Sequence, residues 1–108
     1  MFRRAPGLFL LLLSLTGSAL PAAAAPSPVE AGRTIAERDC SQCHNIAPGG
    51  GSSWTNAPSF QSVADRQGQT AAAVSAYLQK PHLHMLNDNR PKAEADAIAA
   101  YILSLRAR

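Results

Sequence analysis

Two cysteines and a histidine fall within five residues, where Cys40, Cys43 and His44 form a C-x-x-C-H run. Two thiols at this spacing can each add to a vinyl group of a haem, because the two residues between them let the chain turn tightly along one porphyrin edge. The histidine that follows at once can fold beneath the ring and bind the iron. The run is typical of c-type haem attachment, and it predicts one haem c bound covalently through both cysteines.

Other chemistry occurs at C-x-x-C pairs, which are also found in thioredoxin-type dithiols, zinc sites and ordinary disulfides. A thioredoxin-like motif normally lies within alternating strands and helices, and this chain shows no such alternation. His82 and His84 could complete a Cys2His2 zinc set, but their spacing does not fit the usual pair of zinc-binding histidines. The histidine directly after the second cysteine therefore favours haem.

The first 24 residues have the features of a secretory signal peptide. Arg3 and Arg4 give a positive start, residues 8–15 form an apolar core, and residues 21–25 supply a small-residue cleavage site. The apolar core is well short of the ~20 residues that span a bilayer, which favours a cleaved signal over a retained anchor. We expect residues 1–24 to be removed on export and residues 25–108 to form a domain in the periplasm.

Removal of the signal peptide, which contains Arg3 and Arg4, lowers the net charge of the protein. The whole chain has a net charge of +3, and the mature part has eight Lys and Arg against seven Asp and Glu. Near-neutral charge without a basic stripe argues against a nucleic-acid partner. The mature part is one small domain, and domains of this size often need a staple such as a metal or a disulfide. Here the haem is expected to be that staple.

Hydrophobic periodicity predicts three helices, no strand, and hence an all-α fold. The first helix is expected at residues 29–39, so that it delivers the C-x-x-C-H run at its end. Gly32 in this helix is expected to admit a bulky neighbour such as Tyr101 from the last helix, because glycine has no side chain. Glycines, serines and prolines predict a loop over residues 45–58.

The other two predicted helices lie after this loop. The second is expected at residues 70–79, with Thr70 as its N-cap and with Ala71, Val74 and Leu78 on one side. The third is expected to begin with Pro91 at its first helical position. Its core-facing stripe consists of Ile98, Tyr101, Ile102 and Leu105.

These features together resemble the class I cytochrome c family, in particular its small bacterial monohaem members. The resemblance rests on the C-x-x-C-H run, Gly32 eight residues before it, Ala57-Pro58-Ser59-Phe60, a methionine before the last helix, and Ala100-Tyr101-Ile102. It implies a cytochrome c-like fold with a haem packed among about three helices. It also implies an iron held between His44 and a methionine sulfur.

The sixth iron ligand has three candidates in the mature chain, His82, His84 and Met85. Met85 is favoured, with His84 next, because its position before the last helix matches the family and a thioether suits the His/Met ligation of electron-carrying cytochromes. Family members usually have proline directly after this methionine, whereas Leu86 follows it here. The alternatives are a core gap-filling role for Met85 and solvated loop positions for the two histidines.

The resemblance implies supporting roles for two more residues. Pro58 matches the proline whose backbone carbonyl accepts a hydrogen bond from the ligand histidine, which would orient His44. The alternative for Pro58 is a loop proline chosen for its turn geometry. Trp54, the lone tryptophan, has an indole N–H that could reach a haem propionate, and packing over the haem edge is an equal alternative.

An iron with both axial positions filled has no vacancy for a substrate. We therefore expect no enzyme, but a carrier of single electrons between redox protein partners, with no membrane span after signal cleavage. One alternative is the haem-bearing subunit of a periplasmic dehydrogenase complex, and another is an open-site haem peroxidase or gas sensor. Lys80, Arg90 and Lys92 flank the predicted ligand loop and are expected to steer an acidic partner, with a modest effect because the net charge is near zero. The alternative is that all three are scattered solvating charges.

Overall fold

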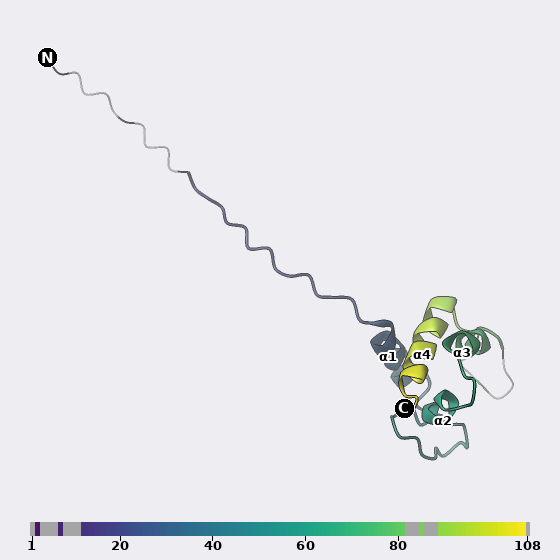
Figure 1. Cartoon of the computed structure of the whole chain (residues 1–108). Helices are drawn as coiled ribbons and strands as arrows, with labels where there is room; N and C mark the ends of the chain where they lie inside the picture. Colours follow the sequence, from purple (N-terminus) through teal and green to yellow (C-terminus); the bar gives the residue numbers. More distant parts are fainter. Residues whose placement is uncertain (1, 3–6, 8–11, 82–84, 86–88, 108) are drawn as a thin grey trace.

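The computed structural model describes residues 2, 7, 12–81, 85 and 89–107, and within them it contains helices and no strand. The predicted all-α class is therefore confirmed. The helices are α1 (Pro28–Asp39), α2 (Phe60–Ala64), α3 (Ala71–Leu78) and α4 (Lys92–Ser104) (Figure 1). The three predicted helices correspond to α1, α3 and α4, and the five-residue α2 was not predicted because it is too short for a periodic pattern.

Helix α1 begins where the sequence supplies a complete cap. The Ser27 hydroxyl accepts a hydrogen bond from the Glu30 N–H, and the Glu30 carboxylate accepts one from the Ser27 N–H. This reciprocal arrangement satisfies two backbone donors that a helix start otherwise leaves open. Pro28 follows the cap at the first helical position. Cys40 forms the C-cap, so the helix ends at the C-x-x-C-H run as predicted.

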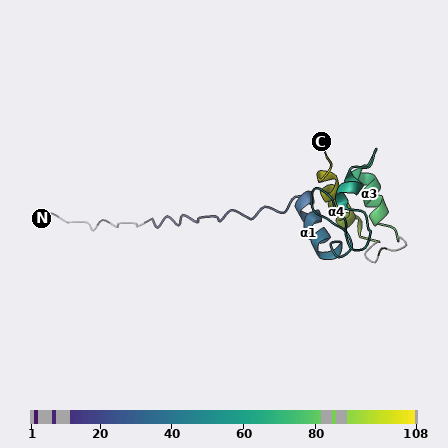
Figure 2. The same ribbon diagram turned by 90° about the horizontal axis from the view of Figure 1, so that it is seen from below.

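Helices α1 and α4 pack against each other more extensively than any other pair, and both views show them side by side (Figures 1 and 2). Gly32 makes this close crossing possible. A Cβ atom added to Gly32 would lie 1.9 Å from the carbonyl oxygen of Ala97 in α4. The predicted close approach is confirmed, but the neighbour is the backbone of Ala97 and not the side chain of Tyr101.

Helix α3 follows its prediction closely and α4 differs at its start. The Thr70 hydroxyl accepts from the Ala73 N–H and caps α3. Val74 and Leu78 are buried as expected, whereas Ala71 is exposed. Pro91 is the N-cap of α4 and not its first helical residue, because its extended ψ of 144° precedes the helix.

The core lies where α4 meets the other helices. Ile98, Tyr101 and Ile102 of α4 are buried as predicted, and Leu105 packs against this core while remaining partly exposed. Phe60, at the start of α2, joins the same cluster. The core thus combines residues from both ends of the domain sequence around α4.

The loop over residues 45–58 contains no helix or strand, as predicted. Gly49, Gly50 and Gly51 all have positive φ, a backbone conformation that side chains disfavour. The side-chain amide of Gln61 in α2 holds the loop. Its Oε1 accepts from the Gly49 N–H, and its Nε2 donates to the Leu105 carbonyl. The irregular loop is therefore tied to the end of α4.

Residues 12–27 extend away from the helices, and all of them are exposed (Figures 1 and 2). Their leucines, Leu12, Leu13, Leu15 and Leu20, contribute nothing to the core. Among the described residues, no helix has the length and apolar character that a membrane crossing requires.

Candidate functional site

The C-x-x-C-H run forms a tight turn directly after α1. The N–H groups of Cys40 and Ser41 both donate to the Ala36 carbonyl at the end of the helix. The Cys40 carbonyl then accepts from the N–H groups of Cys43 and His44 at 3.2 and 3.0 Å. Both cysteines are free thiols, so they are not joined in a disulfide. Burial raises the pKa of the Cys40 thiol.

The His44 ring is oriented by a backbone carbonyl. Its Nδ1 lies 2.6 Å from the carbonyl oxygen of Pro58. Because a carbonyl only accepts, Nδ1 must carry the proton and donate, which leaves Nε2 of a neutral ring with a free lone pair. The ring also packs beside Phe60, with centroids 5.5 Å apart. Nε2 is thus the nitrogen that can bind a metal.

The segment after the C-x-x-C-H run folds back to bind carbonyl groups in the run and directly after it. The Thr55 hydroxyl donates to the Cys43 carbonyl at 2.5 Å, and the Phe60 N–H donates to the Asn45 carbonyl at 2.9 Å. These contacts fix the backbone on both sides of His44. The part played by Thr55 was not predicted, because a single threonine in a loop carries no sequence signal of its own.

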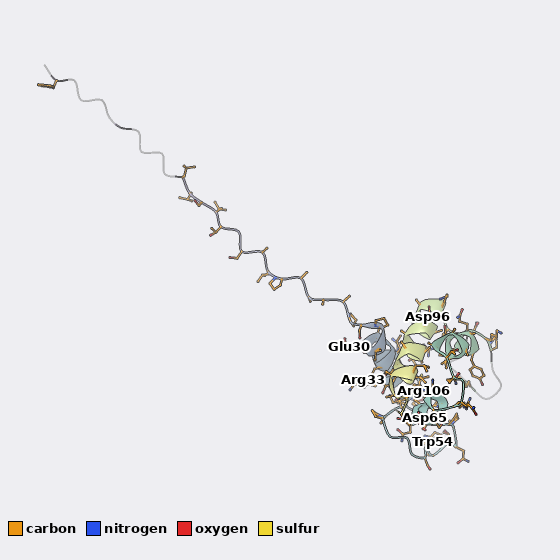
Figure 3. The ribbon with its side chains drawn as sticks, viewed as in Figure 1. Glu30, Arg33, Trp54, Asp65, Asp96 and Arg106 are labelled. Carbon is orange, nitrogen blue, oxygen red and sulfur yellow. The ribbon has the colours of Figure 1, made fainter. Side chains whose placement is uncertain are left out.

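Trp54 adds a third contact of this kind. Its indole N–H donates to the Gln42 carbonyl at 2.6 Å, and the residue is 85% exposed. Figure 3 shows Trp54 at the end of the domain opposite Asp96. Trp54 is not among the described residues that line the cavity beside the two cysteines. The indole nitrogen is therefore engaged by backbone, and a contact with a haem propionate stays a prediction.

A cavity of about 730 Å³ lies beside the C-x-x-C-H run. This volume is within the range of ~300–1,000 Å³ that is usual for ligand sites. Cys40, Cys43, His44 and Met85 all line it. Its apolar wall includes Phe60, Val74, Leu78, Ile98 and Ile102.

The residues around this cavity fit a haem. Two thiols at one wall can form the two thioether bonds, His44 offers an imidazole nitrogen, and the apolar wall suits a flat aromatic ring system. Arg66 and Gln69 also line the cavity and provide hydrogen-bond donors for the carboxylates that a haem carries. The partly buried Met85 packs against the core and brings a thioether to the same cavity.

The other two ligand candidates, His82 and His84, lie outside the described residues. The zinc alternative would need one or both of them, and the described part of the chain contains no group of three or more histidine, cysteine or acidic residues that could hold a metal ion.

A charged cluster lies at the cavity wall next to Cys40. Asp39 accepts hydrogen bonds from both Arg38 and Arg90, and these hold the pKa of the Asp39 carboxyl well below its ordinary value. The Arg90 side chain is only 11% exposed and also pairs with Glu94. The Arg90 guanidinium is therefore largely buried and bound to carboxylates, and the expected steering of an acidic partner stays a prediction.

The cytochrome c family model matches residues 29–106, which is most of the chain and includes all four helices except the first residue of α1. The chain belongs to the cytochrome c family. It is also similar to cytochrome c-552 of Bradyrhizobium diazoefficiens, with 37% identity over 96 residues that cover 89% of this chain and 90% of the relative. No solved structure matches it significantly.

Membership of the class I cytochrome c family identifies the group that the cavity holds. This cytochrome c carries a covalently bound haem c, and Cys40 and Cys43 are the pair of cysteines in the required spacing. It is a haem electron-transfer protein, and it exchanges electrons with redox partners. Both points agree with the predictions from sequence.

Proposed function

We propose that this cytochrome c is an exported carrier of single electrons that works in the periplasm, with His44 and Met85 as its two axial iron ligands. The observation that supports this most strongly is the shared cavity. His44 and Met85 line one apolar space together with both cysteines, although Met85 is 41 residues from His44 in the sequence.

Each residue of the cavity has a separate task in this proposal. Cys40 and Cys43 hold the haem through thioether bonds, so that the cofactor cannot dissociate. The Pro58 carbonyl fixes the His44 tautomer and makes Nε2 the metal-binding nitrogen. Met85 supplies a thioether from the segment before α4. The haem, when bound, supplies an iron that changes oxidation state by one electron.

Two occupied axial positions favour a carrier over an enzyme. With imidazole and thioether both bound, no position is open to peroxide or a diatomic gas. A ligand set that is the same in both oxidation states also needs little rearrangement when an electron moves. A thioether ligand raises the reduction potential relative to a second imidazole.

The amino-terminal segment supports export. Arg3 and Arg4 precede an apolar run and a small-residue stretch, and residues 12–27 extend away from the helical domain. Their removal would leave the core intact, because the core begins with residues of α1. Haem attachment to an exported, unfolded chain agrees with this order of events.

The proposal is tested by an optical redox titration of the purified holoprotein. We expect a reversible one-electron transition, and we expect no spectral change when carbon monoxide is added to the ferrous protein. Rapid carbon monoxide binding would indicate an open iron and favour the sensor or peroxidase alternative. Ferric protein should also show the sulfur-to-iron charge-transfer band in the near-infrared that methionine ligation produces.

A further inference from the structure

We propose, resting on the Met85 ligation proposed above, that Arg90 is a positioning residue for the ligand loop. Its side chain ties the end of this loop, here residues 79–90, to the last residue of α1 beside Cys40. In this way it holds Met85 at the cavity wall. Arg90 makes no contact with the iron in this proposal and acts only through the loop.

The backbone of Arg90 closes the base of the ligand loop. Its N–H donates to the carbonyl of Leu78, the last residue of α3, at 2.7 Å. The two ends of the loop are therefore joined, with Met85 between them. Asn89, directly before Arg90, has a positive φ of 60°, which turns the chain sharply into this contact.

The side chain of Arg90 fixes this base relative to two helices. Its Nη1 donates to the Asp39 carboxylate at 2.7 Å and to the Glu94 carboxylate at 3.2 Å. Asp39 ends α1 and Glu94 lies in the first turn of α4. One guanidinium thus connects the end of the ligand loop to α1 and to α4.

Three observations place this cluster at the site. Asp39, Arg90, Cys40 and Met85 all line the same cavity. Asp39 directly precedes Cys40 in the chain. The contact between Arg90 and Asp39 therefore also fixes the end of the ligand loop relative to one haem attachment point. Arg90 is only five positions after Met85 in the chain, which limits how far Met85 can move while Arg90 is held.

The ion pair between Arg90 and Asp39 is more buried than an ordinary surface ion pair. The Arg90 and Asp39 side chains are 11% and 20% exposed, whereas those of Lys92 and Asp96, also joined by a salt bridge, are 74% and 48% exposed. Exposed pairs contribute little because water screens them, while a largely buried Arg with two carboxylates is held in one geometry. Lys92 therefore provides a matched control two residues away.

The variants for the test are Arg90→Gln and Arg90→Lys, with Lys92→Gln as the control. Replacing Arg90 does not leave Asp39 without a partner, because Arg38 donates to both of its carboxylate oxygens. Arg90→Lys keeps the charge but cannot span two carboxylates in the same way. It also serves as the second variant if Arg90→Gln does not fold.

The measurement is the apparent affinity of the ferric holoproteins for imidazole, which binds only when the Met85 sulfur has left the iron. The apparent affinity then reports the population of the detached state. We expect Arg90→Gln to bind imidazole about tenfold more tightly than the unmodified protein. Arg90→Lys should fall between the two, and Lys92→Gln should match the unmodified protein.

Equal imidazole affinities in the Arg90 variants and the control would overturn the positioning role, even if Arg90→Gln unfolds more easily as a whole. The variant Met85→Ala separates this result from failure of the ligation itself. If Met85→Ala keeps the sulfur-to-iron charge-transfer band, the ligation proposal is wrong, and the Arg90 proposal with it. If that band depends on Met85 and imidazole affinity does not depend on Arg90, only the positioning role fails.

Discussion

His44 illustrates how a few backbone atoms prepare a ligand. Its Nδ1 donates to the Pro58 carbonyl. The carbonyl groups of Gln42 and Cys43 are bound by the returning loop, and that of Asn45 is bound by the first residue of α2. Each hydrogen bond restricts the backbone on which the imidazole is carried. The ring is therefore oriented before any metal binds, which lowers the entropy that ligation would otherwise cost.

Among the groups that bind these carbonyls, the Thr55 hydroxyl can be removed with little change in the shape of its side chain. Thr55→Val deletes its hydrogen bond to the Cys43 carbonyl and keeps the volume of the side chain. We expect the free energy of unfolding to fall by about 1–2 kcal/mol, because a partly buried carbonyl loses its donor. Denaturant titration followed by circular dichroism measures the change. Ser52→Ala, at an exposed position of the same loop, is the control; equal effects in both variants would contradict a specific role for Thr55.

Residue types at fixed spacing could be recognised from the sequence, and residues that meet only in the fold could not. The C-x-x-C-H run and the hydrogen-bonding position of Pro58 follow from local spacing and family resemblance. For Arg90, local spacing predicts only the ion pair with Glu94, which lies four residues later in α4. Its contact with Asp39 joins positions 51 residues apart, and nothing in the local pattern of either residue predicts it.

At the scale of elements, α1 and α4 form the framework that carries the site. α1 ends at Cys40, and α4 supplies Ile98 and Ile102 to the cavity wall. The distance between these two helices is set by Gly32 and the Ala97 backbone. A change at Gly32 should therefore affect both stability and the cavity.

Gly32→Ala tests this framework, and the expected sign is informative. In an exposed helix the substitution would stabilise by about 1 kcal/mol through helix propensity. Here the new methyl group would meet the Ala97 carbonyl, so the helices must separate, and we expect net destabilisation of about 2 kcal/mol. Thermal and denaturant unfolding measure it. Arg33→Ala, on the exposed face of α1, should change stability little; a stabilised Gly32→Ala protein would refute the close crossing.

The carboxylate of Asp39 links stability to pH. Hydrogen bonds from Arg38 and Arg90 lower its pKa, so its contribution is present above the ordinary carboxyl pKa of about 3.9 and is lost as the pH falls toward the lowered value. Glu94 and Cys40 are the other titratable groups of this cluster. We expect Asp39→Asn to be less stable near neutral pH and to lose less stability on acidification below about pH 4.

Chemical denaturation at a series of pH values tests this expectation. Asp65 and Asp96 also have lowered pKa values, owing to hydrogen bonds from Ala107 and Lys92 respectively, and they give the variant a remaining acid sensitivity. Glu37→Gln, at an exposed ion pair, is the control. An acid profile of Asp39→Asn that parallels the unmodified protein would show that the Asp39 cluster carries no such linkage.

Element prediction succeeded where periodicity was long enough to detect. The periodic stripe identified α4, and Thr70 and Pro91 indicated where α3 and α4 begin to within one residue. The short α2 was missed because its five residues form little more than one turn. The neighbour of Gly32 was misassigned because a glycine predicts close approach without indicating which atom approaches.

At the scale of the whole molecule, the extended amino-terminal segment and the helical domain behave as separate parts. Residues 12–27 are exposed throughout, and the cap of α1 begins at Ser27. Cleavage near residue 24 would therefore leave the capping box intact. The mature protein should begin with Ala25, directly before Pro26.

Mass spectrometry of protein expressed in a bacterium that matures c-type cytochromes tests this organisation. We expect a periplasmic species that lacks residues 1–24 and is heavier than its polypeptide by one haem, eluting as a monomer. Retention of the amino-terminal segment in a membrane fraction would contradict the signal-peptide assignment. Stoichiometric co-purification of a larger catalytic chain would instead favour the dehydrogenase-subunit alternative.

The near-infrared spectrum of the oxidised holoprotein, compared with that of Met85→Ala, tests the central claim most directly. The claim is that the sulfur of Met85 and the imidazole of His44 fill both axial positions of the iron. We predict a sulfur-to-iron charge-transfer band in the unmodified protein and its complete loss in Met85→Ala, with the haem still covalently attached. A band that persists in Met85→Ala, or that is absent from the unmodified protein, would contradict Met85 ligation.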